Sequence, residues 1–362
     1  MNKNIAVIGA GNGAHTLAAD LVHRGFSVRM YEQSNYMEKL ETLCKTKKIH
    51  VTGVMNYTSE IEMITDDMAK AIEKATYIAV VTPSFAHEAI AEKMKGIIRK
   101  DQVIVLYPGA FGSLVFRRIL GDECPVVAET NNLPYDTRLK GPATVYCSGI
   151  NPINVAFFPS NAANDYLEDV QQIMPIGYVY KDVLECGLSL VNPALHSGGC
   201  LINMGMMEQP SRGAFYLYEH FTPGAAKIDV VLDRERKAIG KAFGYDLRPI
   251  EDFVKLPQGE QIGWERLYMQ MHGDVALTPI SGPDTIWSRY MTEDCPNGLV
   301  PWSALADVAD VDTPTIDAVV TIYSHVHERD WWNIGRKLEN LGLDGLSKDE
   351  ILHYVATGER KA

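Results

Sequence analysis

The first half of the chain alternates short apolar runs with stretches of helical periodicity. Between residue 4 and about residue 180, the apolar runs are IAVIG, SVRMYE, YIAVVTP, VIVLYPG, PVVAETN, TVYCSG and NVAFFP. Strands that alternate with helices predict βαβ units, a mainly parallel sheet and ligand binding at the carboxyl ends of its strands. KIHVTG and SEIEMIT predict a small antiparallel excursion within this half.

The second half has a different pattern of hydrophobic and polar residues. After GYVYKD the segments are long and rich in Leu, Met and Ala, and their apolar positions recur with a period of 3.6 residues. We expect helices over residues 183–208, 225–243, 313–327 and 348–356. The fold class is therefore α/β, with an N-terminal doubly wound (Rossmann) domain over residues 1–182 and a C-terminal all-helical domain over residues 183–362.

Length and charge limit the classes of function. A chain of 362 residues is too long for one ordinary core and suits two domains. Its formal net charge of -12 argues against nucleic acid as a partner, because nucleic-acid binding normally needs a basic face. The sequence also has no apolar run long enough to span a membrane. Small molecules remain as the expected partners, and any anion among them must be held by local contacts.

Six cysteines are scattered along the chain without a C-x-x-C pair or a zinc-type spacing. This usage is typical of a cytoplasmic protein with reduced thiols, and we expect no metal site. Cys200 lies close to the strongest candidate for a reactive residue, but a buried structural thiol is the alternative interpretation.

A glycine cluster lies between the first predicted strand and the first predicted helix. Gly9, Gly11 and Ala14 fit the dinucleotide fingerprint G-x-G-x-x-G/A. Gly9 would make the tight turn, Gly11 would let the backbone approach a pyrophosphate, and Ala14 would allow the helix to pack closely on the strand. Asn12 and Gly13 complete the predicted cofactor turn. The alternative is a glycine-rich turn that binds nothing.

The second predicted strand ends at Glu32, about where an acidic residue accepts the ribose 2'-hydroxyl of NAD. A carboxylate there would repel a 2'-phosphate, so NAD is favoured and NADP is the alternative. Arg29 lies three residues earlier and is the one nearby partner for a 2'-phosphate, although we interpret it as a surface charge.

Two further strands end in proline-bearing turns and lead into helices, at TPSFAHE and YPGAFGS. A doubly wound sheet places its ligand at such strand ends, which makes Thr82, Pro83, Pro108 and Gly109 candidate cofactor contacts. Ordinary turn chemistry explains the two prolines equally well.

Reduction of a carbon–heteroatom double bond needs a proton donor, and histidine serves this role near neutral pH. His196 stands out among ten histidines, because it follows Asn192 and Pro193 on the first long helix of the second half, among small and apolar residues. The alternative is a buried, hydrogen-bonded histidine. His87 is a weaker candidate, and we interpret His327 and its neighbours as a solvated helix end rather than a metal site.

Six segments together resemble the opine dehydrogenases, the octopine and nopaline dehydrogenase-like enzymes. They are GAGNGAHTLAADLVHRGFSVRMYE, TPSFAHE, YPGAFGS, ETNNLPYDTR, NPALH and GPDTIWSRYMTEDCPNGLVPWSALADVADVDTPTIDAVV, and the similarity runs from the first strand to about residue 325. The resemblance implies a reductive condensation of an amino acid with a 2-oxo acid such as pyruvate, through an imine, with NAD(P)H as reductant.

The resemblance also implies roles for individual residues. His196 would be the acid/base group, Asp294 would orient it, and Arg289 would bind a substrate carboxylate as a two-pronged donor. Asn132 and Thr137 would contact the substrates, but the family more often has threonine and cysteine at these two positions. Substrate identity is therefore open, and an ion pair between Arg289 and Asp294 on a helix surface is the structural alternative.

Two rival functions remain. A 2-oxo or 2-hydroxy acid reductase of the ketopantoate type also joins a Rossmann domain to helices, but it usually brings a lysine from the connecting helix, and no lysine lies between Lys181 and Lys227. The other rival is an NAD-binding module without turnover. Trp264, Trp287 and Tyr290 belong either to the pocket or to the core. The long apolar helices are compatible with a homodimer.

Overall fold

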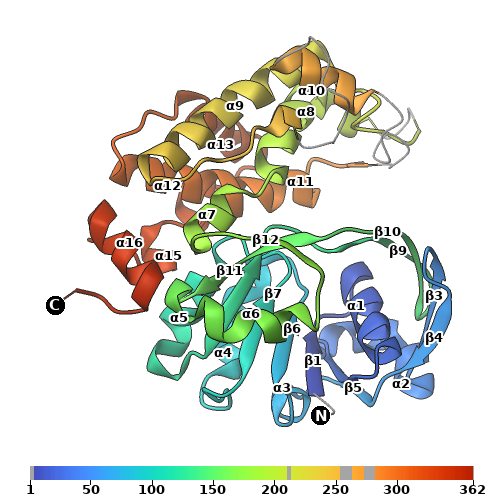
Figure 1. Ribbon diagram of the computed structural model, residues 1–362. Helices are drawn as coiled ribbons and strands as arrows, with labels where there is room; N and C mark the ends of the chain where they lie inside the picture. The colour runs from blue at the N-terminus through green and yellow to red at the C-terminus, as the bar shows by residue number, and fades with distance from the viewer. Residues whose placement is uncertain (1–3, 210–212, 253–262, 273–281, 362) are drawn as a thin grey trace. The chain divides into compact units, whose positions relative to one another are not determined.

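The computed structural model describes residues 4–209, 213–252, 263–272 and 282–361. Contacts divide the chain into two compact units (Figure 1). The first comprises residues 1–186 together with 353–362, and the second comprises residues 187–352. The domain limits expected from the sequence, 1–182 and 183–362, stay a prediction; the contact units change at residue 186 and return the last ten residues to the first unit.

The first unit is built on an eight-stranded sheet of order β12-β11-β8-β7-β6-β1-β2-β5. All neighbours in it are parallel except β8 and β11. Chain order reverses between β1 and β6, which is the switch point of a doubly wound sheet. The strand bounds are β1 Asn4–Ile8, β2 Ser27–Tyr31, β5 Met63–Thr65, β6 Tyr77–Val80, β7 Val103–Leu106, β8 Val126–Thr130, β11 Ile153–Phe158 and β12 Ile176–Val179.

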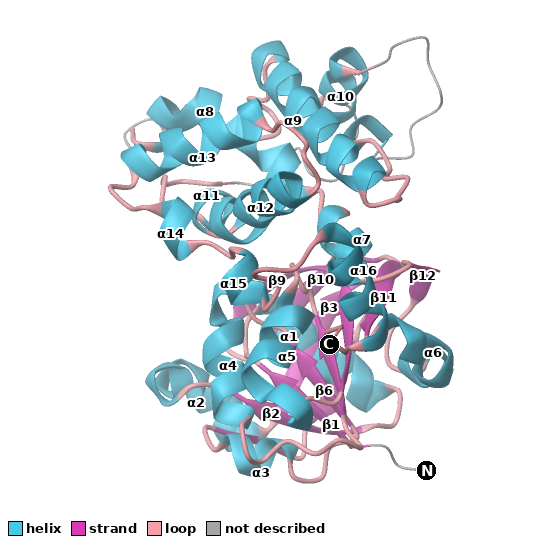
Figure 2. Cartoon of the chain, turned by 90° about the vertical axis from the view of Figure 1, so that its left-hand side faces the viewer, coloured by secondary structure: helices cyan, strands magenta, loops and turns pink. Residues whose placement is uncertain are grey.

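The central strands are buried along their whole length because helices cover the sheet (Figure 2). Such strands consist of continuous apolar residues, as the sequence of β6 and β7 shows. The helices of this unit are α1 Asn12–His23, α2 Glu41–Thr46, α3 Met68–Ile72, α4 His87–Met94, α5 Gly112–Leu120 and α6 Ala163–Gln171, and α7 Val183–Leu188 follows across the change of unit. The predicted α/β class with a mainly parallel sheet is confirmed.

A second sheet of four strands packs on α1. Its order is β4 (Tyr57–Glu60), β3 (Lys48–Gly53), β10 (Thr144–Ile150) and β9 (Tyr135–Gly141). The Ser59 hydroxyl donates to the Ala19 carbonyl over 2.7 Å, and the Tyr135 hydroxyl donates to Asp20 over 2.7 Å. The expected antiparallel excursion is present as β3 and β4. However, β5 joins the large sheet beside β2, and β10 belongs to the small sheet.

The second unit is helical in its described residues, apart from an isolated bridge between Tyr216 and Gly282. Its helices are α8 Asn192–Met207, α9 Pro223–Ala242, α10 Trp264–Met271, α11 Arg289–Thr292, α12 Val300–Val308, α13 Pro314–Val326, α14 Trp331–Ile334 and α15 Leu338–Leu341; α16, Lys348–Thr357, crosses the change of unit. The expected helix 183–208 is two helices, α7 and α8. Pro193 explains the break, because proline has no N–H to donate and is tolerated only in the first turn.

Close packing of α8 on α9 depends on small residues. A Cβ added to Gly198 would lie 2.6 Å from the Ala225 carbonyl oxygen and 2.5 Å from Asp229 Oδ1. The Gly198 N–H donates to this Asp229 oxygen, and the Tyr323 hydroxyl of α13 donates to the Ser197 carbonyl over 2.9 Å. These two bonds join α8 to its neighbours α9 and α13. None of the described helices is both long and apolar enough to cross a membrane.

Candidate active site

The glycine turn in the first unit has the geometry that a dinucleotide needs. Gly9 has φ +109°, and a Cβ there would lie 2.6 Å from the Val81 carbonyl oxygen, so only glycine fits. A Cβ on Gly13 would lie 2.6 Å from Leu133 Cδ2, whereas one on Gly11 would meet nothing within 4 Å. No side chain caps the start of α1 at Gly11. The exposed Gly11 backbone and the helix N-terminus are suited to an anion such as pyrophosphate.

Asn12 and Ala14 lie in the same turn with different environments. Ala14 is fully buried, as close packing of α1 on the sheet requires. Asn12 Oδ1 accepts the Leu139 N–H of β9 over 2.8 Å, so its side chain joins the cofactor turn to the small sheet. Because this side chain is engaged, we expect Asn12 to contact the cofactor through its backbone.

Glu32 lies directly after β2 and is oriented by the cofactor turn. Its Oε2 accepts the Ala10 N–H over 2.9 Å, and its Oε1 accepts the Gln33 N–H over 2.8 Å. A carboxylate oxygen has a second acceptor position, so both can still receive a ribose hydroxyl. The residues present therefore fit the adenosine side of NAD.

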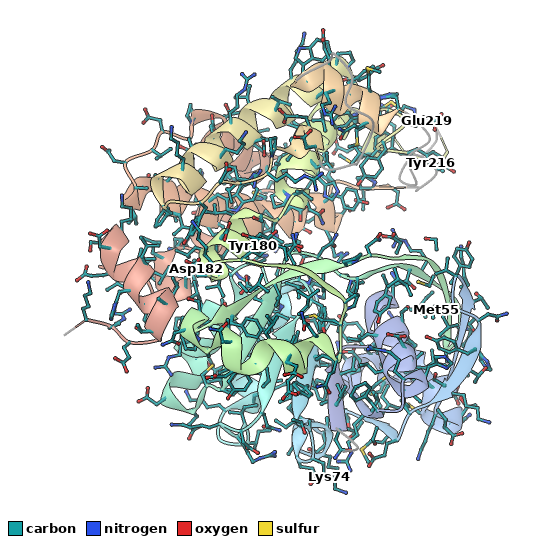
Figure 3. The ribbon with its side chains drawn as sticks, in the orientation of Figure 1. Met55, Lys74, Tyr180, Asp182, Tyr216 and Glu219 are labelled. Atoms are coloured by element: carbon teal, nitrogen blue, oxygen red, sulfur yellow. The ribbon has the colours of Figure 1, made fainter. Side chains whose placement is uncertain are left out.

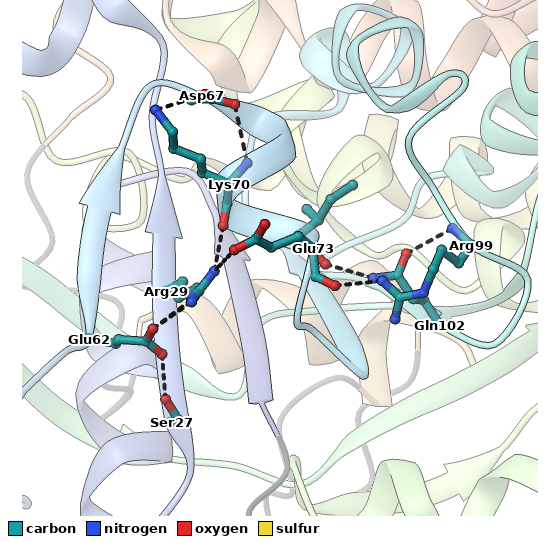
Figure 4. Close-up of polar contacts among 9 residues, drawn as sticks. Ser27, Arg29, Glu62, Asp67, Lys70, Glu73, Arg99 and Gln102 are labelled. Atoms are coloured by element: carbon teal, nitrogen blue, oxygen red, sulfur yellow. Dashed lines mark hydrogen bonds and ion pairs between the residues drawn. The ribbon is translucent and has the colours of Figure 1, made fainter.

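Arg29 does not lie on the surface, contrary to the interpretation from sequence. Only 4% of it is exposed, and its guanidinium binds Glu62 (2.6 Å), Glu73 (2.9 Å) and the Lys70 carbonyl (2.8 Å) (Figure 4). Register explains the error, because β5 pairs with β2 at Arg29 and Met63 and brings Glu62 beside the arginine. Arg29 is consequently occupied and unavailable to a 2'-phosphate.

The ends of β6 and β7 contribute further polar groups. The Thr82 hydroxyl is buried and has no hydrogen-bond partner among the described residues, and a Cβ added to Gly9 would lie 3.0 Å from Thr82 Cγ2. A buried hydroxyl without a partner beside the glycine turn fits a bound ligand. Pro83 precedes a short helical turn over Ser84–Ala86, and Pro108 follows a cis peptide bond.

The packing of Glu129 explains why residue 109 is a glycine. A Cβ there would lie 1.9 Å from Glu129 Cγ. The buried Glu129 carboxylate accepts the N–H groups of Phe111 (2.7 Å) and Ser113 (2.9 Å) at the start of α5. Gly109 thus makes room for the carboxylate that caps α5.

The two predicted substrate contacts in this unit lie in different surroundings. Asn132 is exposed after β8, and its Oδ1 accepts the Leu133 N–H over 2.8 Å. Thr137 is buried in β9, where its hydroxyl is 2.7 Å from the Thr16 hydroxyl of α1 and 3.1 Å from the Tyr146 carbonyl. The described structure therefore engages Thr137 in packing between α1 and the small sheet, and its role toward a substrate stays a prediction.

The second unit brings His196 and Asp294 together. His196 Nδ1 lies 2.6 Å from Asp294 Oδ2. An ionised carboxylate only accepts, so Nδ1 carries the proton and Nε2 faces the other way. Burial raises the pKa of the Asp294 carboxyl, and its hydrogen bond to His196 opposes this shift.

A π-helical turn over Cys295–Leu299 positions Asp294 directly before it. Turns of this kind frequently occur at functional sites. A Cβ on Gly298 would lie 2.3 Å from Pro193 Cγ, so the π turn packs on the first turn of α8, which also carries His196. Two segments almost a hundred residues apart in sequence are joined in this way.

Arg289 forms an ion pair with Glu293 and not with Asp294. The structural alternative, which required an ion pair between Arg289 and Asp294, is therefore wrong. Arg289 Nη1 lies 3.3 Å from Glu293 Oε2, and 65% of the arginine side chain is exposed. The remaining donors of its guanidinium fork can bind a carboxylate. The neighbouring Tyr290 stacks on the His196 imidazole, with ring centroids 3.9 Å apart and planes inclined by 4°. Tyr290 therefore belongs to the site, whereas Trp287 is half exposed.

Sequence reasoning missed Tyr218. Its hydroxyl lies 3.0 Å from His196 Nε2, and no spacing in FYLYEHF announces this contact. His327 was also misjudged: it is buried, with Nε2 2.7 Å from the Ile286 carbonyl and Nδ1 accepting from Trp331 over 3.0 Å. Cys200 is buried, in keeping with the structural interpretation.

Known dehydrogenase families match both halves of the chain. Residues 179–327 match the family model described as NAD/NADP octopine/nopaline dehydrogenase, alpha-helical domain. Residues 4–110 match the model of the NAD-dependent glycerol-3-phosphate dehydrogenase N-terminus. An opine dehydrogenase of Arthrobacter sp. (strain 1C) is 32% identical over 360 residues, which cover 98% of this chain and 99% of that protein.

Solved structures share the fold. Octopine dehydrogenase with NADH and pyruvate is similar at a TM-score of 0.77 and 21% identity, with 99% of both chains covered. A ketopantoate reductase from Ralstonia eutropha JMP134 is less similar, with a TM-score of 0.64 and 12% identity over 90% of this chain and 98% of that one. On the full-length match, this chain belongs to the opine dehydrogenase family of NAD(P)-dependent oxidoreductases that act on CH–NH bonds.

Proposed function

We propose that this chain condenses an amino acid with a 2-oxo acid and reduces the resulting imine, with His196 as the proton donor and NADH as the preferred reductant. The pairing of His196 Nδ1 with Asp294 over 2.6 Å carries this proposal. It leaves Nε2 as the atom that exchanges a proton, and it stabilises the imidazolium with a carboxylate. The proposal is supported by an opine dehydrogenase relative and by an octopine dehydrogenase bound to NADH and pyruvate.

The chain's residues would act in sequence. Arg289 would hold a substrate carboxylate while the amine adds to the 2-oxo carbon to give a carbinolamine. The His196 imidazolium would then donate the proton with which the carbinolamine hydroxyl leaves as water, and the C=N bond forms. A bound nicotinamide supplies the hydride that reduces this bond. In the reverse direction His196 would accept a proton from water.

The preference for NADH rests on two side chains. Glu32 would present a carboxylate to the 2'-phosphate of a bound NADPH, and Arg29 is bound by Glu62 and Glu73. Two negative charges so close together would repel each other, which disfavours the binding of NADPH. The ratio of the dissociation constants of NADPH and NADH tests this: Glu32→Ser should lower it, because serine still bonds a ribose hydroxyl and removes the charge.

The unpaired state of the six cysteines supports a cytoplasmic location. The partners we propose are an amino acid and a 2-oxo acid, and the long apolar helices of the second unit are compatible with a homodimer.

NADH absorbance distinguishes the rival functions. Oxidation of NADH that needs both pyruvate and an amino acid mixture supports the imine reaction. Oxidation with pyruvate alone would instead indicate a C=O reductase, and none with any 2-oxo acid would indicate a binding module. His196→Ala should lose turnover by about 10²-fold or more while it still binds NADH. The exposed histidine His325 offers the matched control, because His325→Ala should keep wild-type turnover.

A further inference from the structure

Tyr218 occupies the side of His196 from which a proton must leave. The segment between α8 and α9, marked by Tyr216 and Glu219 in Figure 3, carries this tyrosine. Its hydroxyl lies 3.0 Å from His196 Nε2, and only 5% of either residue is exposed. Asp294 holds the opposite ring nitrogen, and Tyr290 covers one face of the imidazole. Contacts on three sides therefore surround the ring.

The direction of these hydrogen bonds follows from the tautomer. Since Nδ1–H donates to Asp294, Nε2 of the neutral imidazole can only accept, and the Tyr218 hydroxyl donates to it. When the imidazole is protonated, Nε2–H donates to the Tyr218 oxygen instead. The phenol hydrogen then turns from Nε2 toward another acceptor; the Tyr290 side chain already hydrogen-bonds Tyr218, and a substrate oxygen would be the acceptor during turnover. Tyr218 can thus follow either protonation state of His196 without moving its oxygen.

We propose that Tyr218 is a further catalytic residue, which passes the proton between His196 Nε2 and the oxygen of the substrate. This inference rests on the proposed role of His196. Three observations carry it: the hydrogen bond at Nε2, the burial of both groups, and the continuous line of polar atoms from Asp294 through His196 to Tyr218.

The relay balances in atoms and charge. The His196 Nε2–H bond breaks as a new O–H bond forms at Tyr218, and the original phenol O–H bond breaks as its hydrogen passes to the carbinolamine hydroxyl. The C–O bond then breaks, water leaves, and the nitrogen lone pair forms the C=N bond. One positive charge moves from the imidazolium to the iminium.

Tyr218 is neutral before and after this step. Burial raises the pKa of its phenol well above the ordinary value, and Tyr290 raises it further. An ionised Tyr218 is therefore disfavoured, but a concerted relay never requires one. The same burial keeps bulk water away from Nε2, so the phenol is the group through which a proton can leave.

Tyr323 provides a matched comparison. Its hydroxyl is also buried and donates to the carbonyl of Ser197, the residue after His196, over 2.9 Å. A phenylalanine at 323 removes one phenol hydrogen bond from the same turn of α8 but leaves Nε2 unchanged. Effects on packing should therefore be similar in Tyr218→Phe and Tyr323→Phe, while effects on proton transfer should differ.

The experiment measures single-turnover oxidation of NADH in H₂O and D₂O with the full-length protein, pyruvate and the amino acid that wild type accepts. Tyr218→Phe should lower the rate by about 10²-fold or more and change the solvent isotope effect. NADH binding and melting temperature should stay near those of wild type, and Tyr323→Phe should keep the wild-type rate. A Tyr218→Phe rate within about threefold of wild type with the same isotope effect, or equal losses in both variants, would overturn the relay.

A second variant tests the relay even if Tyr218→Phe does not fold. Incorporating 3-fluorotyrosine at 218 keeps the size and the hydroxyl but makes the phenol more acidic, so the relay predicts a changed rate and isotope effect; wild-type values would overturn it. The proposed function fails separately, and the relay with it, if wild type oxidises no NADH with both substrates or if His196→Ala keeps its rate. If the two changes at position 218 leave the wild-type rate and isotope effect, while His196→Ala loses turnover, the relay alone fails.

Discussion

Gly11→Ala should separate cofactor binding from stability. Gly11 has φ -80° and ψ -168°, which any residue adopts, and a Cβ there would meet nothing within 4 Å. Alanine gains about 0.4–1 kcal/mol by restricting the unfolded chain and gives up a comparable amount as a poorer helix cap. We therefore expect a change in the free energy of unfolding close to zero.

NADH affinity should respond differently. The added methyl group would stand where the pyrophosphate must approach the backbone N–H groups of the turn. We expect the dissociation constant of NADH to rise at least about tenfold, which corresponds to about 1.4 kcal/mol. The melting temperature should change by less than about 2 °C, because 1 kcal/mol shifts it by about 2–4 °C in domains of this size.

Gly25→Ala is the matched control. Gly25 has φ +91° after the end of α1, and a Cβ there also meets nothing within 4 Å. Backbone strain of about 1–2 kcal/mol should lower the melting temperature without changing NADH affinity. NADH fluorescence titration and thermal unfolding measure both quantities. If Gly11→Ala binds NADH as wild type does, or loses as much stability as Gly25→Ala, the assignment of Gly11 to the cofactor is refuted.

Three further substitutions test other parts of the structure. Arg289→Lys should raise the KM of the carboxylate substrate more than it lowers kcat, since lysine cannot form a two-pronged bond; steady-state kinetics with an equal loss in kcat would argue against a binding role. Arg29→Met should lower the free energy of unfolding by about 1–3 kcal/mol in urea, because the Lys70 carbonyl loses its donor and two carboxylates lose their counter-ion. An unchanged midpoint would contradict this, and NADPH affinity should not improve.

Asp229→Asn should alter the pH dependence of stability. Burial raises the pKa of Asp229 well above its ordinary value, and the Gly198 N–H opposes the shift. The native state then holds a proton that the unfolded state releases, so this group's stabilisation is complete below the unfolded pKa and is lost as pH rises toward the native one. Wild type should lose stability relative to Asp229→Asn as the pH rises above about 4, the ordinary pKa of an aspartate. Parallel denaturation curves across that range would refute it.

The sequence was most informative where local chemistry decides structure. Gly9, Ala14 and Glu32 lie between a strand, a turn and a helix that their own neighbours specify, so their placement followed from spacing. The pairing of His196 with Asp294 came from the family resemblance, because nothing in a sequence shows that a π turn will pack on Pro193.

The errors arose where distant strands or helices decide burial. Arg29 resembles a surface charge until β5 pairs with β2 and brings Glu62 to it, while the end of α3 brings Glu73. His327 resembles a solvated helix end until Trp331 and the Ile286 carbonyl bind both its nitrogens. Tyr218 was missed for the same reason, since its contact with His196 depends on the path of the chain between α8 and α9.

The return of residues 353–362 to the first unit bears on how the protein is made. Tyr354 packs against Phe158 with ring centroids 5.4 Å apart, and the Gly358 carbonyl accepts from Arg117 over 3.3 Å. A ribosome releases the nucleotide-binding sheet early, but the segment that covers this corner of it emerges only after the helical unit. The first unit can therefore complete its packing around Phe158 only after the whole helical unit has been synthesised.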